Sequence, residues 1–196
     1  MTERSARCSR KTKETDISLS FTIEGQGPST IQTGIPFFDH MLDLFSHHGL
    51  FEMNLAVKGD IQVDFHHTVE DVGICLGQVF REALGNASGI QRYASGLIPM
   101  DEALVQIAID ISGRPYLHFK SNFPKAKVGE FDVELVEEFF RAFATNARIT
   151  MHMDVLHGVN LHHMIEGCFK GFGVLLDQAS QIDPRKKNIP STKGVL

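Results

Sequence analysis

A duplicated histidine motif is the feature of this sequence that most constrains its fold. Residues 65–70 (FHHTVE) recur as residues 161–166 (LHHMIE), so the pattern His-His-x-x-Glu occurs twice with identical spacing. One such motif is weak evidence for a functional site, because histidines at helix starts are often only hydrogen-bonded. Packing of apolar side chains, however, does not require the same polar pattern in two separate segments. The duplication therefore predicts two similar halves that share one chemical role.

Hydrophobic periodicity supports two halves with the same order of elements. In the first half, the pattern predicts a strand over 16–23, a helix from Pro36 to about Ser46 that Gly49 stops, a hairpin of strands over 53–57 and 61–65, and a helix from its cap Thr68 to Gly85. After a linking region at 86–100, the second half predicts a strand over 103–109, a turn at 113–115 into a hairpin partner over 116–119, a helix over 135–143, a strand over 149–155 and a helix over 165–176.

These elements predict an α+β fold of internally duplicated β-β-α-β-β-α halves, with small sheets and helices packed on one face of each. Neither helix pair can bury its apolar stripe except against another layer, so we expect the four helices to pack between or against the sheets. The two halves are expected to form one domain. The predicted segments are a basic N-terminal tail at 1–13, a first half at 14–90, a second half at 91–183 and a C-terminal tail at 184–196.

Charge and composition exclude several classes of protein. The formal net charge is −5, and no Lys/Arg excess lies in the part expected to fold, which argues against a nucleic-acid partner. The basic cluster within residues 4–13 is interpreted as a solvated terminus. Three widely spaced cysteines indicate no disulfide framework. No signal peptide or membrane-spanning apolar run is visible, so no membrane partner and a cytoplasmic location are expected.

The spacing within the motif suits metal binding. On a helix, the second His and the Glu lie three residues apart on one face, whereas the first His points about 100° away and can reach another ion. The repeat also aligns His40, 26 residues before His66, with Glu138, 24 residues before His162. The pooled set of candidate ligands is His40, His66, His67, Glu70, Glu138, His162, His163 and Glu166. Four nitrogen and oxygen ligands for each of two ions leave open coordination positions and suit manganese, iron or zinc.

Five motifs in this order resemble those of the imidazoleglycerol-phosphate dehydratase family, from about Arg10 to the C-terminus. They are residues 38–43 (FDHMLD), 64–71 (DFHHTVED), 112–116 (SGRPY), 162–166 (HHMIE) and 190–194 (PSTKG). The resemblance implies a lyase of histidine biosynthesis that dehydrates D-erythro-imidazole glycerol phosphate to imidazole acetol phosphate. It also implies two Mn²⁺ per active site, with other divalent metals possible. The implied fold resembles ribosomal protein S5 domain 2, and the implied assembly is a 24-subunit shell with active sites between subunits.

The resemblance further implies roles for individual residues. The implied catalytic residues are Glu14, Glu70 and Glu166, and the implied substrate-binding residues are Glu14, His40, Arg92, Arg114, Lys170, Ser191, Thr192 and Lys193. The tail around Ser191 would bind the substrate phosphate, although a frayed terminus is the plain alternative. Relatives often carry His where this chain has Glu138, which leaves the neighbouring Glu137 as a competing ligand.

Two other functions remain open from the residues alone. A dinuclear metal hydrolase would also use paired ions to activate water. In a metal-storage or structural metal protein, protein ligands would fill every coordination position of the ions, and the protein would catalyse no reaction. The remaining histidines carry weaker signals: His47 and His48 sit at a predicted helix end, where a positive charge is favoured, and His118, His152 and His157 lie on or near predicted strands.

Overall fold

The computed structural model describes residues 3–25 and 27–196 of the chain. The first half contains β1 (Ser5–Lys11), β2 (Thr15–Thr22), β3 (Thr30–Gln32), α1 (Pro36–His48), β4 (Glu52–Gly59) and α2 (His66–Leu84). The second half contains β5 (Tyr93–Met100), β6 (Ala103–Asp110), β7 (Tyr116–Lys120), the short pair β8 (Lys127–Val128) and β9 (Phe131–Asp132), α3 (Leu135–Ala147), β10 (Thr150–His157) and α4 (Leu161–Ser180). No helix among the described residues is long and apolar enough to cross a bilayer.

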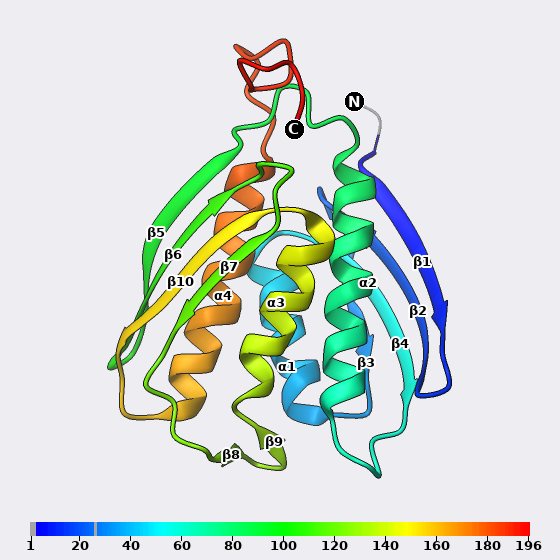
Figure 1. Cartoon of the computed structure of the whole chain (residues 1–196), viewed down its shortest axis with the longest axis vertical. Coiled ribbons are helices and arrows are strands. Elements are labelled where there is room, and N and C mark those ends of the chain that lie inside the picture. Colours follow the sequence, from blue (N-terminus) through cyan, green and yellow to red (C-terminus); the bar gives the residue numbers. More distant parts are fainter. Residues whose placement is uncertain (1–2, 26) are drawn as a thin grey trace.

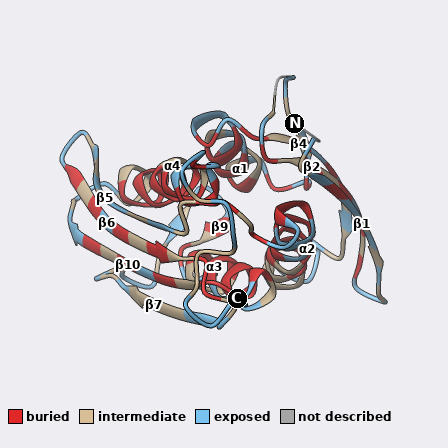
Figure 2. Cartoon of the chain, turned by 90° about the horizontal axis from the view of Figure 1, so that it is seen from above, coloured by how far each residue is buried: buried red, intermediate tan, exposed pale blue. Residues whose placement is uncertain are grey.

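Two four-stranded sheets enclose the four helices (Figures 1 and 2). Their strand orders, β1-β2-β4-β3 and β5-β6-β10-β7, are the same topology repeated. In both sheets the last strand pairs in parallel and the other pairs are antiparallel. The equivalent strands β2 and β6 also share one burial pattern, in which every second side chain faces the helices. The duplicated α+β fold and the helix layer between the sheets are therefore confirmed.

The helices of the two halves pack across the repeat rather than within it. α1 of the first half packs on α4 of the second, and α3 of the second packs on α2 of the first. Glycines permit these close approaches: a Cβ on Gly77 of α2 would lie 2.6 Å from the carbonyl oxygen of Phe143 in α3, and one on Gly173 of α4 would lie 2.4 Å from that of Phe45 in α1. A core of fully buried phenylalanines fills the layer, including Phe38, Phe45, Phe139, Phe140, Phe143, Phe169 and Phe172. Each half therefore buries the apolar faces of its helices against helices of the other half.

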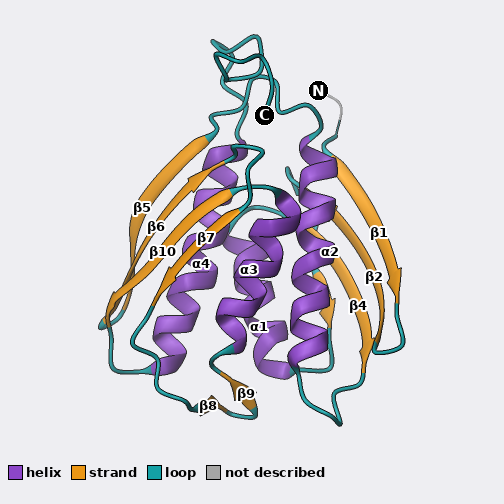
Figure 3. Ribbon diagram, in the orientation of Figure 1, coloured by secondary structure: helices purple, strands orange, loops and turns teal. Residues whose placement is uncertain are grey.

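Both predicted hairpins, 53–57 with 61–65 and 103–109 with 116–119, are wrong. Residues 61–65 form no strand, and Ile61 and Val63 are exposed, because the two edges of β4 are already paired with β2 and β3. In the second half, β7 pairs in parallel with β10 and not with β6. The strands β3 and β5 were not predicted, since neither contains a fully buried residue that would sharpen the alternation. The order within each half is thus β-β-β-α-β-α, with β8 and β9 inserted in the second (Figure 3).

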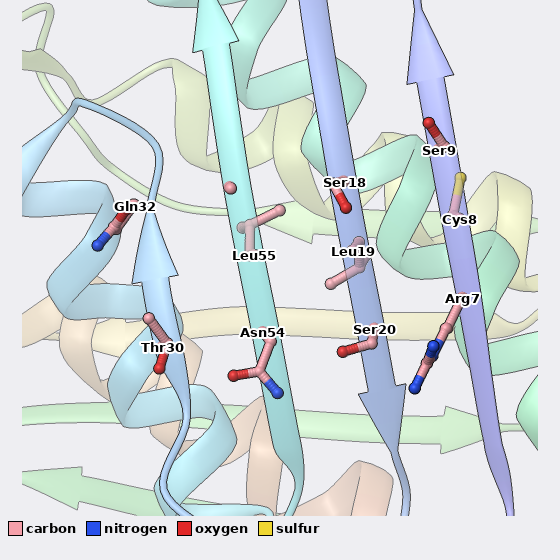
Figure 4. A pocket seen from close by; sticks show the side chains of 11 residues that line it. Arg7, Cys8, Ser9, Ser18, Leu19, Ser20, Thr30, Gln32, Asn54 and Leu55 are labelled. Atoms are coloured by element: carbon pink, nitrogen blue, oxygen red, sulfur yellow. The ribbon is translucent and has the colours of Figure 1, made fainter.

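The interpretation of residues 1–13 as a solvated tail is wrong for most of that segment. Ser5–Lys11 forms β1, which pairs along its whole length with β2, and Met1 and Thr2 lie outside the described residues. Basic side chains suit this position because β1 is an edge strand, where charge discourages pairing with another chain. Arg7 lines a shallow pocket on the outer, polar face of the sheet (Figure 4), which contains no residue of the duplicated motif.

The C-terminal tail is held against the body at the end opposite the β1–β2 turn (Figure 1). Ile182 forms a β-bridge with Ile90, and the Arg92 Nη1 donates to the carbonyl oxygen of Pro190 at 2.7 Å. Gly113, at φ 70°, lies directly against the backbone of Leu196, where any side chain would collide. The segment is therefore packed, although Thr192 and Lys193 themselves are exposed.

Candidate metal centre

The two copies of the motif begin their helices in the same way. The Asp64 carboxylate accepts the backbone N–H of His66 at 2.8 Å, and the Asn160 side chain accepts that of His162 at 2.9 Å. These Asx caps stand two residues before the first histidine of each copy and satisfy a free N–H of the first turn. The predicted cap Thr68 is wrong, because it is a buried residue inside α2, packed against Gly59. Each His-His pair is thereby fixed on the first helical turn.

The second copy contributes to a group of three side chains that could hold a metal ion. His40 of α1 joins His162 and Glu166 of α4, with one ligand atom of each within 4.8 Å of the others. The His162 Nε2 lies 3.1 Å from the Glu166 Oε2, and the His40 and His162 rings are 5.8 Å apart. Two imidazoles and a carboxylate are a donor set that divalent manganese, iron or zinc accepts. The packing of α1 on α4 brings this group together, and its chemistry fits a divalent metal ion.

Lys170 holds the other oxygen of the Glu166 carboxylate, one helical turn further along α4. Burial pushes the pKa of Glu166 upward, but the hydrogen bond and charge of Lys170, with a contribution from His162, outweigh it. The pKa of Glu166 therefore lies below its usual range, and the buried carboxylate is ionised at neutral pH. An ionised carboxylate is the form that can ligate a cation.

The first copy has different surroundings. The His67 Nδ1 lies 3.0 Å from the Asp60 carboxylate, and its Nε2 lies 3.7 Å from the Glu14 carboxylate in the β1–β2 turn. The hydrogen bond to Asp60 raises the pKa of His67, and the charge of Glu14 adds to the effect. Within the described part of the chain, no group of three donors forms around His66, His67 or Glu70. Of the eight candidate ligands, the described part of this single chain brings His40, His162 and Glu166 together.

His163 is held in the same manner by the β5–β6 turn. Its Nδ1 lies 2.8 Å from the Glu102 carboxylate, and its Nε2 lies 3.9 Å from that of Asp101. The hydrogen bond from His163 is the main cause that lowers the pKa of Glu102 to about 2, with help from the backbone N–H groups of Asn160 and Val159. Glu102 in turn raises the pKa of His163. Sequence reasoning missed Asp60, Asp101 and Glu102, because a single carboxylate in a turn has no spacing signal.

Arg92, Arg114 and the C-terminal tail, which were expected to bind the substrate, lie at the other end of the molecule. The Arg92 Nε lies 2.7 Å from the Asp110 Oδ1, the Arg114 Nη2 lies 3.9 Å from the Asp110 Oδ2, and the backbone of Arg92 bonds to the last turn of α4. The His162 end of α4 is separated from this end by a helix of 20 residues, or about 30 Å (Figure 1). Of the expected substrate-binding residues, His40 belongs to the group of three donors and Lys170 contacts Glu166 of that group. One chain cannot bring both ends to the same small molecule.

Comparison with known proteins identifies the family of the chain. The family model for imidazoleglycerol-phosphate dehydratase matches residues 33–176. The imidazoleglycerol-phosphate dehydratases of Bacillus licheniformis and Bacillus subtilis are 57% and 56% identical over 193 residues, which cover 98% of this chain and all of theirs.

Two solved structures share the fold. The imidazoleglycerol-phosphate dehydratase of Staphylococcus aureus superposes with a TM-score of 0.84 at 42% identity, covering 91% of this chain and 99% of that one. IGPD from Pyrococcus furiosus superposes with a TM-score of 0.83 at 36% identity, covering 96% and 100%. The chain therefore belongs to the imidazoleglycerol-phosphate dehydratase family, whose members are hydro-lyases of histidine biosynthesis.

Proposed function

We propose that the chain is a metal-dependent hydro-lyase that converts D-erythro-imidazole glycerol phosphate to imidazole acetol phosphate, with two Mn²⁺ at each active site. The group formed by His40, His162 and Glu166 is the observation that carries the metal requirement. When bound, the metal ions would supply Lewis-acid chemistry and a template for the imidazole ring. A biosynthetic role of this kind is expected in the cytoplasm.

The cross-packing of helices supports a second, equivalent group of ligands. His40 reaches the second copy of the motif because α1 of the first half packs on α4 of the second. In the same way, α3 of the second half packs on α2 of the first, which carries the first copy. The buried residues of α1 and α3 align when His40 is matched with Glu138. Glu137 is instead paired with Arg141 on the helix surface. We therefore assign Glu138, with His66 and Glu70, to the second group, and His67 and His163 to the two ions as well.

Separation of the two ends within a chain favours active sites between subunits. A phosphate group needs cations and hydrogen-bond donors, and the end that contains Arg92, Arg114 and the tail residues Ser191, Thr192 and Lys193 supplies them. The tail of one subunit would thus meet the metal-binding residues of another, as a closed shell of 24 chains would allow. Native mass measurement tests the shell, with a single particle of 24 chains of 21.8 kDa each as the expected result.

Glu14 is the residue that we assign to proton transfer. It lies in the β1–β2 turn with its side chain half-exposed, and it faces His67 across 3.7 Å. Its carboxylate would accept the carbon-bound proton while hydroxide leaves the neighbouring carbon, so that the elements of water are lost. The enol that results becomes the ketone. Lys170 would keep Glu166 ionised and contact the substrate from the same side as His40.

The decisive experiment is an assay of purified protein on imidazole glycerol phosphate, combined with metal analysis. We expect a ketone product without inorganic phosphate, loss of activity after chelation, and recovery with Mn²⁺. Release of inorganic phosphate would instead favour the dinuclear hydrolase. Full activity in the chelated, metal-free protein would contradict the metal requirement.

A subunit-mixing experiment tests the location of the site. Glu166→Gln removes a proposed metal ligand, and Lys193→Ala removes a proposed phosphate contact at the far end of the chain. Each variant alone should be nearly inactive, whereas oligomers assembled from both should regain activity, because some sites combine two unaltered ends. Mixed oligomers as inactive as either parent would contradict sites between subunits.

A further inference from the structure

The second histidine of each motif copy is held at the same ring nitrogen by a carboxylate. The His67 Nδ1 lies 3.0 Å from the Asp60 Oδ2, and the His163 Nδ1 lies 2.8 Å from the Glu102 Oε2. In both copies the opposite nitrogen, Nε2, is left to face the turn between the first two strands of its own half. The local geometry of the two imidazoles is therefore the same.

The two carboxylates come from positions that the repeat does not relate. Asp60 directly follows β4, and the residue that follows the equivalent strand β10 is Gly158. Glu102 directly precedes β6, and the residue that precedes the equivalent strand β2 is Glu14. Copying of one half into the other therefore does not account for the shared contact. The same contact is made from two different places in the fold.

An imidazole that donates its Nδ1 hydrogen to a carboxylate presents a lone pair at Nε2. This choice of tautomer, together with a fixed ring plane, prepares the nitrogen to ligate a cation and increases its basicity. Without the carboxylate, the neutral ring would exchange between two tautomers and turn about its side-chain bonds. Loss of such a contact weakens metal binding by about 10- to 100-fold in other proteins.

We infer that Asp60 and Glu102 are positioning residues that fix the Nδ1–H tautomer and the ring orientation of His67 and His163, so that Nε2 of each faces a metal ion. The inference rests on the proposed metal requirement. It also explains an asymmetry between the two turns. Glu102 binds the His163 Nδ1 and two backbone N–H groups. In the first half the contact with the His67 Nδ1 is made by Asp60, and not by Glu14, which is the counterpart of Glu102. The Glu14 carboxylate is thereby left available for proton transfer.

Asp60 offers the cleaner test of the two positions. Among the described residues its side chain hydrogen-bonds to His67 alone, and its second oxygen is buried without a partner there. Glu102 additionally holds the backbone N–H groups of Val159 and Asn160 at 3.1 and 2.8 Å, ahead of α4. Glu102→Gln keeps an oxygen for these groups, and Asp60→Asn keeps the shape of the side chain. Neither change should prevent folding.

The test is a calorimetric titration of Mn²⁺ into metal-free, full-length, assembled protein. Asp60→Asn and Glu102→Gln should each weaken Mn²⁺ binding by about 10- to 100-fold. The matched control is Asp154→Asn, which breaks the 3.0 Å His118–Asp154 pair on the outer face of the second sheet and should leave Mn²⁺ binding unchanged. The unfolding temperature of each metal-free variant should stay near that of the parent, and Asp60→Glu should recover part of the lost affinity.

The outcomes separate this inference from the proposed function. If the parent protein binds Mn²⁺ and both variants bind it with equal affinity, the positioning role is wrong while the metal requirement stands. Affinity that falls only in proportion to a lowered unfolding temperature of the metal-free protein would also overturn the positioning role. If the parent protein binds no Mn²⁺, the metal requirement fails first and the positioning role fails with it.

Discussion

The two copies of the His-His-x-x-Glu motif have nearly the same sequence and different surroundings. Both begin a helix behind an Asx cap, and both have the second histidine bound to a carboxylate. The copy on α4 also has His40 and Lys170 beside Glu166, whereas the copy on α2 has Glu14 facing His67 and Ile74 at the position equivalent to Lys170. Duplication thus supplied a common set of ligands, while differences outside the motif placed a lysine beside Glu166 in one copy and the Glu14 carboxylate beside His67 in the other.

The largest expected effect comes from the Glu14 carboxylate, which lies beside His67 of the first copy. Glu14→Gln should lower kcat by about 10²- to 10⁴-fold, because proton transfer by a positioned side chain contributes that much. Metal content should be unchanged, and steady-state kinetics with metal analysis on the same sample measures both. Glu52→Gln, a glutamate on β4, serves as the control. Near-normal turnover of the metal-loaded Glu14 variant would show that this carboxylate does not transfer the proton.

Replacement of Lys170, the cation beside Glu166 of the second copy, should have the next largest effect. Lys170→Met leaves the buried Glu166 without its charged partner, so its pKa should rise. Since hydrogen bonds to charged groups contribute about 1.5–3 kcal/mol, kcat/KM should fall by roughly 10- to 100-fold. Ile74→Met places the same side chain at the equivalent position of α2 and should change activity little. Equal losses in both variants would contradict the asymmetry between the copies.

Acidification should weaken metal binding at both copies. A ligating imidazole must be neutral, and hydrogen bonds to Asp60 and Glu102 raise the pKa of His67 and of His163. A raised pKa means that protons compete with the metal already on the alkaline side of pH 6.5, and the competition strengthens as the pH falls. Mn²⁺ affinity, titrated at pH 8, 7 and 6, should drop about tenfold per unit for each imidazole that must lose a proton. Equal affinity at pH 8 and pH 6 would refute this.

The smallest expected effect concerns the Asx helix caps that the two copies share. Asp64→Ala and Asn160→Ala each remove a helix cap and should lower the free energy of unfolding of the metal-free protein by about 1 kcal/mol. Asp64→Asn and Asn160→Asp keep a capping oxygen and are the controls, with changes of a few tenths of a kcal/mol expected. Denaturant titration measures all four. A large difference between the two alanine variants would show that the caps are not equivalent.

The sequence was most informative where the pattern of buried residues was strong. The four helices follow from their apolar stripes, and Gly49 ends α1 as expected, with its N–H bonded to the carbonyl oxygen of Phe45. Strands that face the helices on one side, such as β2, β6 and β10, were also predicted. The edge strand β1 and the weakly buried β3 and β5 were missed, because their side chains do not alternate between core and solvent sharply enough.

By itself, the sequence determined the helices, the duplication and the identity of the chemical groups, because these depend on local spacing along the chain. The tertiary structure alone decided which groups meet. Packing of α1 on α4 brings His40 to Glu166, and turns at the ends of strands bring Asp60 and Glu102 to the histidines. The tertiary structure also places the C-terminal tail about one helix length from the histidines. Such contacts join residues far apart in the chain, and they form only where burial of apolar faces fixes how helices and sheets stack.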